Sequence, residues 1–210
     1  MVGGRLLTYA IAAWSGFYVM VIELLGGRLI SPFFGSSVYV WGSVIFVFML
    51  ALSGGYLLGG RLSRHASSIT RLCLILIAAA LTTLPILMLS EPLLNAIFDR
   101  NFDPRYGSLL ACLLLFTVPT VCSGMISPYA IHLNAASAGS TGQNAGNLYF
   151  ISTVGSSAGT LLTAFYFVLW FDIDTIFLGA IAISVALGLF GIIVDRMRAA
   201  AKVPVYALEK

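Results

Sequence analysis

Six long apolar stretches, separated by short polar connections, run along this chain. Each approaches the roughly 20 apolar residues that a helix needs to cross the hydrocarbon core of a bilayer. The stretches cover about residues 6–29, 38–60, 71–90, 107–127, 147–171 and 174–195. We therefore predict an all-α polytopic membrane protein with six transmembrane helices. Its transmembrane domain would cover residues 1–198, and residues 199–210 would form a short cytoplasmic tail.

The composition agrees with a membrane protein and excludes an ordinary soluble domain. Hydrophobic residues make up 60% of the chain and charged residues only 9%. The three cysteines, Cys73, Cys112 and Cys122, lie in or near apolar stretches and have no metal-ligand spacing. We expect buried thiols, no metal site, no cofactor and no nucleic-acid partner.

The first apolar stretch has the features of a retained helix rather than a cleaved signal peptide. It is long, it contains Glu23, and no small-residue cleavage site follows it before Arg28. We therefore count it as the first transmembrane helix.

The distribution of basic residues predicts the orientation in the membrane. Cytoplasmic loops of membrane proteins carry an excess of Lys and Arg. With the N-terminus inside, only Arg28, Arg100 and Arg105 lie outside, and eight basic residues lie inside: Arg5, Arg61, Arg64, Arg71, Arg196, Arg198, Lys202 and Lys210. An even number of spans then places both termini in the cytoplasm.

Prolines mark two places where we expect departures from regular membrane helices. The connection from Glu91 to Tyr106 is the longest predicted loop, and its segment 92–98, which begins with a proline, has the pattern of a short interfacial helix. Pro119 lies inside the fourth stretch, where it removes a backbone hydrogen bond and predicts a kink.

Two similar short segments indicate an internal repeat. Residues 29–33 (LISPF) follow the first predicted span, and residues 125–129 (MISPY) follow the fourth. In each case a polar connection and a new helix near an aromatic residue come next. A unit of three spans is odd, so its second copy would be inverted in the membrane, as in many transporter folds. We predict two inverted three-helix repeats whose Ser31-Pro32 and Ser127-Pro128 turns are equivalent; a chance match is the alternative.

Glu23 is the most informative polar residue because a carboxylate inside a membrane span is expensive. Ala12, Gly16 and Gly27 fall on the same helix face and leave a narrow groove around the acid. Two interpretations follow. Glu23 either bonds to a neighbouring helix or to Arg28 as a structural acid, or it forms a substrate or proton site.

Other faces of the predicted helices carry small or hydroxyl side chains. Gly55 and Gly59 would let another helix approach the second span closely, and Gly159 lies in a similar position on the fifth. A hydroxyl face also runs along the fifth span, through Tyr149, Thr153, Ser156, Thr160 and Thr163. Such a face either bonds to neighbouring helices or lines a wet cavity.

Four blocks of the sequence resemble the membrane domain of bacterial spermidine-synthase-like proteins. They are residues 22–37, 39–45, 54–62 and 147–162. The resemblance implies a location in the bacterial inner membrane. It also implies a cytosolic Rossmann-like aminopropyltransferase domain after the membrane domain, but this chain ends at Lys210 without a segment of that kind. We therefore expect no aminopropyl transfer by the chain alone, and no catalytic residue carries over.

Two functions remain in competition. In the first, the chain binds or transports a small cationic amine: Glu23 supplies the anion, hydroxyls supply neutral contacts, and aromatic rings support cation–π binding. In the second, it is a non-catalytic anchor or assembly subunit for a soluble synthase-like protein, another membrane protein or a second copy. An integral-membrane enzyme ranks last because no nucleophile–base pair appears. The candidate binding residues are Glu23, Arg28, Tyr39, Trp41, Tyr149, Thr153, Ser156 and Thr160.

Overall fold

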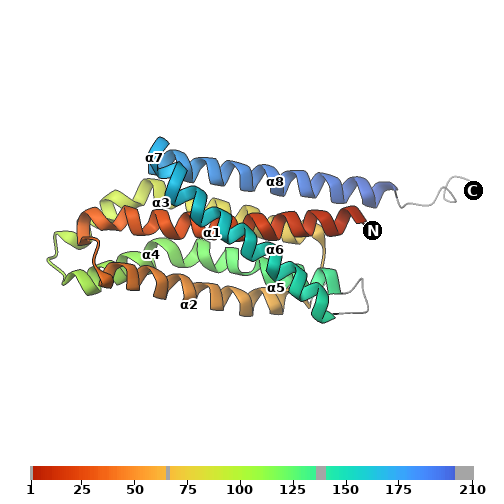
Figure 1. Cartoon of the computed structure of the whole chain (residues 1–210), viewed down its shortest axis with the longest axis horizontal. Helices are drawn as coiled ribbons and strands as arrows, with labels where there is room; N and C mark the ends of the chain where they lie inside the picture. The colour runs from red at the N-terminus through yellow and green to blue at the C-terminus, as the bar shows by residue number, and fades with distance from the viewer. Residues whose placement is uncertain (1, 65–66, 136–140, 202–210) are drawn as a thin grey trace, which may run out of the picture.

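A computed structural model describes residues 2–64, 67–135 and 141–201 of the chain. Every regular element in these ranges is helical (Figure 1). The long helices are α1 (Val2–Phe34), α2 (Val38–Ser63), α3 (Ile69–Phe98), α4 (Pro104–Gly124), α5 (Ile126–Ala135), α6 (Thr141–Leu162) and α8 (Ile173–Ala201). A five-residue π-helix, η1 (Thr163–Phe167), and the short α7 (Val168–Trp170) join α6 to α8. Most of the tail predicted at 199–210 lies outside the described residues.

Six helical segments of the described chain are long and apolar enough to cross a membrane, as the sequence predicts. They are longer than predicted at most ends: 4–34, 38–63, 69–98, 104–134, 142–170 and 173–200. The separate interfacial helix predicted at 92–98 is wrong, because these residues are the last turns of α3. Leu94 and Ile97 lie in the hydrophobic core, so burial of this end of α3 outweighs the lost hydrogen bond of Pro92.

The fourth span consists of two collinear helices. α4 continues through Pro119 and ends at Gly124. Met125 separates it from α5, which begins at Ile126. The Ser31-Pro32 and Ser127-Pro128 segments, predicted as turns, lie inside α1 and α5. Pro128 occupies the first turn of α5, where a missing N–H costs little.

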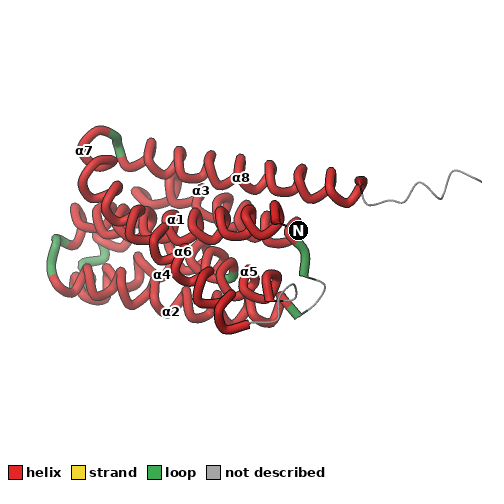
Figure 2. Tube along the Cα trace, turned by 45° about the vertical axis from the view of Figure 1, so that its right-hand side comes forward, coloured by secondary structure: helices red, strands yellow, loops and turns green. Residues whose placement is uncertain are grey.

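α1 is the central helix of the bundle. It contacts α2, α3, α4, α5, α6 and α8. The most extensive of these contacts is with α6. Away from α1, the major pairings join α2 to α4, and α3 to both α4 and α8. Figures 1 and 2 show α6 running obliquely across α1, so that α6 covers one side of the bundle while much of its own surface stays exposed.

Two close helix crossings hold the halves of the molecule together. Gly59 of α2 lies against the backbone of Met125 on the fourth span, and Gly159 of α6 lies against the backbone of Phe17 on α1. A side chain added at either glycine would enter the backbone of the partner. The glycines therefore allow the close approach that the sequence predicts.

The two crossings are built in the same way, because in each of them both helices contribute a glycine to the contact. Gly124 of α4 presses on Leu52 of α2, and Gly16 of α1 presses on Ser152 of α6. Each first helix of one half therefore crosses the second helix of the other. Two inverted three-helix units would produce this pair of crossings. In that arrangement Ser15-Gly16 is equivalent to Ser123-Gly124, whereas the sequence predicts equivalence of the two Ser-Pro segments. The inverted repeat stays a prediction, with this revised register.

The centre of the bundle is apolar with a few satisfied hydroxyl groups. Tyr18 is fully buried, and its hydroxyl donates to Thr83 Oγ1 at 2.8 Å. Where α1 meets α4, Ser15 Oγ donates to the Ser123 carbonyl oxygen at 3.4 Å. Such bonds satisfy polar groups at little cost in the membrane interior.

The orientation predicted from the basic residues has a direct test. In a variant without native cysteines, a cysteine at Ser67 should be protected from a membrane-impermeant maleimide added outside, and a cysteine at Asn101 should react. These residues lie in the connections at opposite ends of α3. Labelling at position 67 with protection at 101 would contradict the predicted orientation.

Candidate functional site

Glu23 lies on α1 between two contacts with different helices. Two turns before it, Gly16 packs against Ser152 and Ser156 of α6. One turn after it, Gly27 packs against Trp41 of α2. Ala12, Gly16 and Gly27 are all buried, and Glu23 itself is half-buried. The half-buried acid therefore lies in a stretch of α1 whose small residues on the predicted face pack against α6 and α2.

The carboxylate of Glu23 has no partner within the described part of the chain. No hydrogen bond or ion pair there involves it; Arg105, for example, pairs with Asp103 at 3.9 Å. Arg28 is exposed, and its guanidinium donates to the Val168 carbonyl oxygen at 3.3 Å. The interpretation of Glu23 as a structural acid bonded to Arg28 therefore finds no support in the geometry.

Trp41 packs against Gly27, which the helical pattern places on the same face of α1 as Glu23. A Cβ atom at Gly27 would lie 2.7 Å from both Cη2 and Cζ3 of Trp41, so the ring rests directly on the backbone of α1. Glycine is required for this approach, because any larger residue would displace the indole. The ring lies roughly one helical turn, about 6 Å along the axis, beyond Glu23.

Tyr39 is engaged elsewhere. The Arg105 guanidinium carbon lies 4.4 Å from the centre of its ring, in cation–π geometry. Tyr39 and Arg105 line an open depression between α2 and α4 together with Ser43 and Leu109. The structure thus brings Trp41 next to the Glu23 face but pairs Tyr39 with a cation of its own chain.

The predicted hydroxyl face of α6 divides into exposed and inward-facing residues. Tyr149, Thr153 and Thr160 are exposed, and Thr160 Oγ1 donates to the Ser156 carbonyl oxygen of its own helix at 3.0 Å. Ser156 turns toward α1: its Oγ lies 2.7 Å from where a Cβ of Gly16 would be. Of the four candidate residues on α6, Ser156 is therefore the one that borders the Glu23 face.

Thr163, the last residue of the predicted hydroxyl face, lies outside the predicted candidate set. It is fully buried, and its Oγ1 has no hydrogen-bond partner among the described residues. The crossing pairs Gly155 with Ala13 and Gly159 with Phe17, so α1 and α6 run in the same direction. Continued by one turn, this register brings Thr163 level with Val21, and η1 contacts α1.

Thr163 is also the first residue of the π-helix. Such wide turns are rare and occur frequently at functional sites. The sequence places Thr163 at the end of the hydroxyl face, but a π-helix has no pattern that would distinguish this threonine from the exposed ones. The unpaired carboxylate of Glu23 can accept hydrogen bonds from a small cationic ligand.

Comparisons with known proteins identify no relative: no family model, no curated protein and no solved structure matches this chain.

Proposed function

We propose that this protein binds a small organic cation, such as a polyamine, at the Glu23 face of α1. The observation that carries the proposal is a half-buried carboxylate inside a transmembrane helix with no hydrogen bond or ion pair from the described residues. A lone charge in that place costs at least about 2.5 kcal/mol on insertion scales. Membrane proteins keep such a residue where a ligand or ion offsets the cost.

The surrounding residues suit an alkylammonium ion. The carboxylate would form an ion pair with the ammonium group, and the Trp41 ring, one turn away, would attract the same charge through its face. Ser156, which lies against Gly16 two turns before Glu23, would accept an N–H donor from the far end of a polyamine. Arg28, whose charge would repel an amine, instead bonds to the Val168 carbonyl. The site is thus acidic, aromatic and hydroxyl-lined.

The resemblance to the membrane domain of spermidine-synthase-like proteins makes spermidine the first ligand to test. It also supports a location in the bacterial inner membrane, with both termini in the cytoplasm. In this proposal the chain delivers, stores or transports the amine, and the chemistry of the amine lies elsewhere.

Binding of radiolabelled spermidine to the purified protein in lipid nanodiscs tests the proposal. We expect saturable binding that unlabelled spermidine displaces. A neutral diol of similar length should not compete, because it lacks the charge that pairs with Glu23. Absence of saturable binding to protein that is folded and monodisperse would refute the proposal.

A second candidate function is assembly with another membrane protein or with a second copy. The observation that favours it is the exposed hydroxyl side chains of Thr153, Ser157 and Thr160 on α6. Polar side chains of membrane helices are frequently hydrogen-bonded to other helices. Thr160 already bonds to its own helix, which makes its exposure inexpensive. We therefore rank assembly second; failure of amine binding together with cross-linking through a cysteine at Thr153 would favour it.

A further inference from the structure

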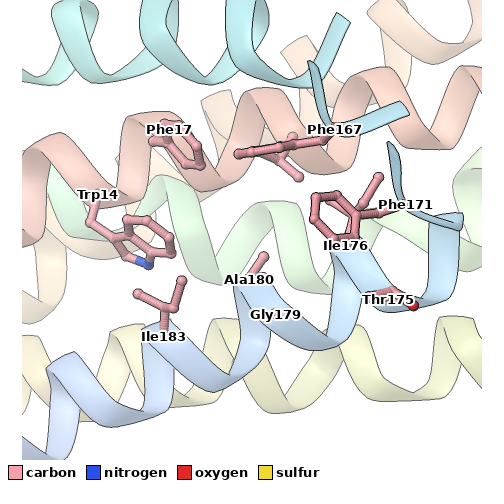
Figure 3. Close-up of a pocket in the computed structure, with 10 residues that line it drawn as sticks. Trp14, Phe17, Phe167, Phe171, Thr175, Ile176, Gly179, Ala180 and Ile183 are labelled. Atoms are coloured by element: carbon pink, nitrogen blue, oxygen red, sulfur yellow. The ribbon is translucent and has the colours of Figure 1, made fainter. Parts of the chain in front are cut away.

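An apolar cavity lies between α1, α8 and the η1–α7 segment (Figure 3). Its volume is about 320 Å³, and its walls include Trp14, Phe17, Phe167, Phe171, Ile176 and Ile183. This volume is at the lower end of the range for small-molecule sites. The lining offers almost no polar surface, so the cavity suits a hydrocarbon group.

The polar atoms near the deep end of the cavity are already paired. Trp14 Nε1 donates to Ser184 Oγ at 2.7 Å, and Ser184 Oγ donates to the Ala180 carbonyl at 2.7 Å. The indole therefore presents its ring rather than its N–H. From Thr175 to Ile183 the cavity follows α8 for eight residues, about 12 Å along the axis. Its shape suits an extended alkyl chain.

The other end of the cavity lies where α7 turns into α8, and charged residues of both signs lie next to its lining residues in the chain or bond to their neighbours. Arg28 is exposed and bonds to the carbonyl of Val168, beside the lining residues Phe167 and Phe171. Asp172 directly follows Phe171, and Asp174 directly precedes the lining residue Thr175. Both carboxylates are exposed, and no ion pair among the described residues involves them or Arg28.

We propose that this cavity holds one acyl chain of a phospholipid whose headgroup carries both a phosphate and a primary ammonium, as in phosphatidylethanolamine. Arg28 binds the phosphate, and Asp172 and Asp174 bind the ammonium. A headgroup with a phosphate alone would leave both carboxylates facing a second anion. This site is independent of Glu23, and it can exist whether or not the protein binds a soluble amine.

Gly179 provides the variant that fills the cavity. It lines the cavity, and a Cβ added to it would meet no atom within 4 Å. Gly179→Phe should therefore fold and occupy the space of the alkyl chain. Gly60→Phe on α2 is the matched control, because a Cβ there also meets no atom within 4 Å and Gly60 is remote from the cavity.

Native mass spectrometry of the full chain, exchanged into mixed phosphatidylethanolamine and phosphatidylglycerol, tests the proposal. The wild type and Gly60→Phe should retain one phosphatidylethanolamine, and Gly179→Phe should lose it by about tenfold or more. The double variant Asp172→Asn, Asp174→Asn should retain a lipid but lose the preference for phosphatidylethanolamine.

Either of two results would overturn the proposal. One is wild-type lipid occupancy in Gly179→Phe, which would show that the chain lies elsewhere. The other is uptake of the two lipids by the wild type in proportion to their abundance, which would show that the charges at the cavity end do not select a headgroup. The second readout holds even if Gly179→Phe fails to fold.

Discussion

Gly159→Leu should melt at a much lower temperature than the wild type in detergent, or fail to fold. A Cβ atom at this position would lie 2.5 Å from the Phe17 carbonyl oxygen and 3.0 Å from its Cα. The obstacle is backbone, which cannot rotate away as a side chain could. Overpacking of a tight interface typically costs about 1–3 kcal/mol, and α6 depends mainly on α1 for its contacts. Thermal unfolding followed by circular dichroism measures the loss.

Gly55→Leu should produce a comparable loss, because Gly55 meets the backbone of Val121 and Gly124 in the equivalent crossing. Gly60→Leu is the control for both variants, since the same substitution enters open space on α2. It should leave the melting temperature unchanged or slightly raised, given the higher helix propensity of leucine. If Gly159→Leu, Gly55→Leu and Gly60→Leu had the same melting temperature, Gly159 and Gly55 would not be the points of closest helix approach.

Glu23→Gln should fold normally and bind spermidine about 10- to 100-fold more weakly than the wild type. The substitution preserves shape and removes only the charge, and hydrogen bonds to charged groups contribute about 1.5–3 kcal/mol. Equilibrium binding in nanodiscs measures the effect. Glu91→Gln is the control, because Glu91 is an exposed acid on α3, remote in sequence from the Glu23 face.

Comparison with Glu23→Leu separates a ligand site from a structural acid. At a ligand site, both substitutions weaken amine binding, and the glutamine variant keeps its stability. If Glu23 only bonds to a neighbouring helix, glutamine should bind spermidine as the wild type does, and leucine should lower the melting temperature. Unchanged binding in both variants would remove Glu23 from the site.

The apolar stretches predict the helical class and the six spans because hydrophobic length is the dominant constraint on a chain in a bilayer. The boundaries are less predictable because proline does not end a membrane helix as reliably as a soluble one. Pro32, Pro92 and Pro128 all lie inside helices. Extra burial, as at Leu94 and Ile97, outweighs the missing hydrogen bond in α3.

The candidate site was predictable only in part. Helical periodicity predicts that Glu23 shares a face with Ala12, Gly16 and Gly27, and the structure buries all three of the small residues. Which helix covers that face is a tertiary property: Trp41 faces Gly27, whereas its near neighbour Tyr39 pairs with Arg105. The burial of Thr163 depends on the crossing of α6 over α1, which no local pattern encodes.

Protection of Glu23 from a hydrophobic carbodiimide is the most direct test of the proposed cation site. Such reagents dissolve in the bilayer and modify carboxyl groups that they reach there, and mass spectrometry of the resulting peptides locates the adduct. We expect modification of Glu23 in the free protein and a dose-dependent decrease with added spermidine, but no decrease with the neutral diol. Equal modification of Glu23 at every spermidine concentration would contradict the proposal that the amine occupies the site around this carboxylate.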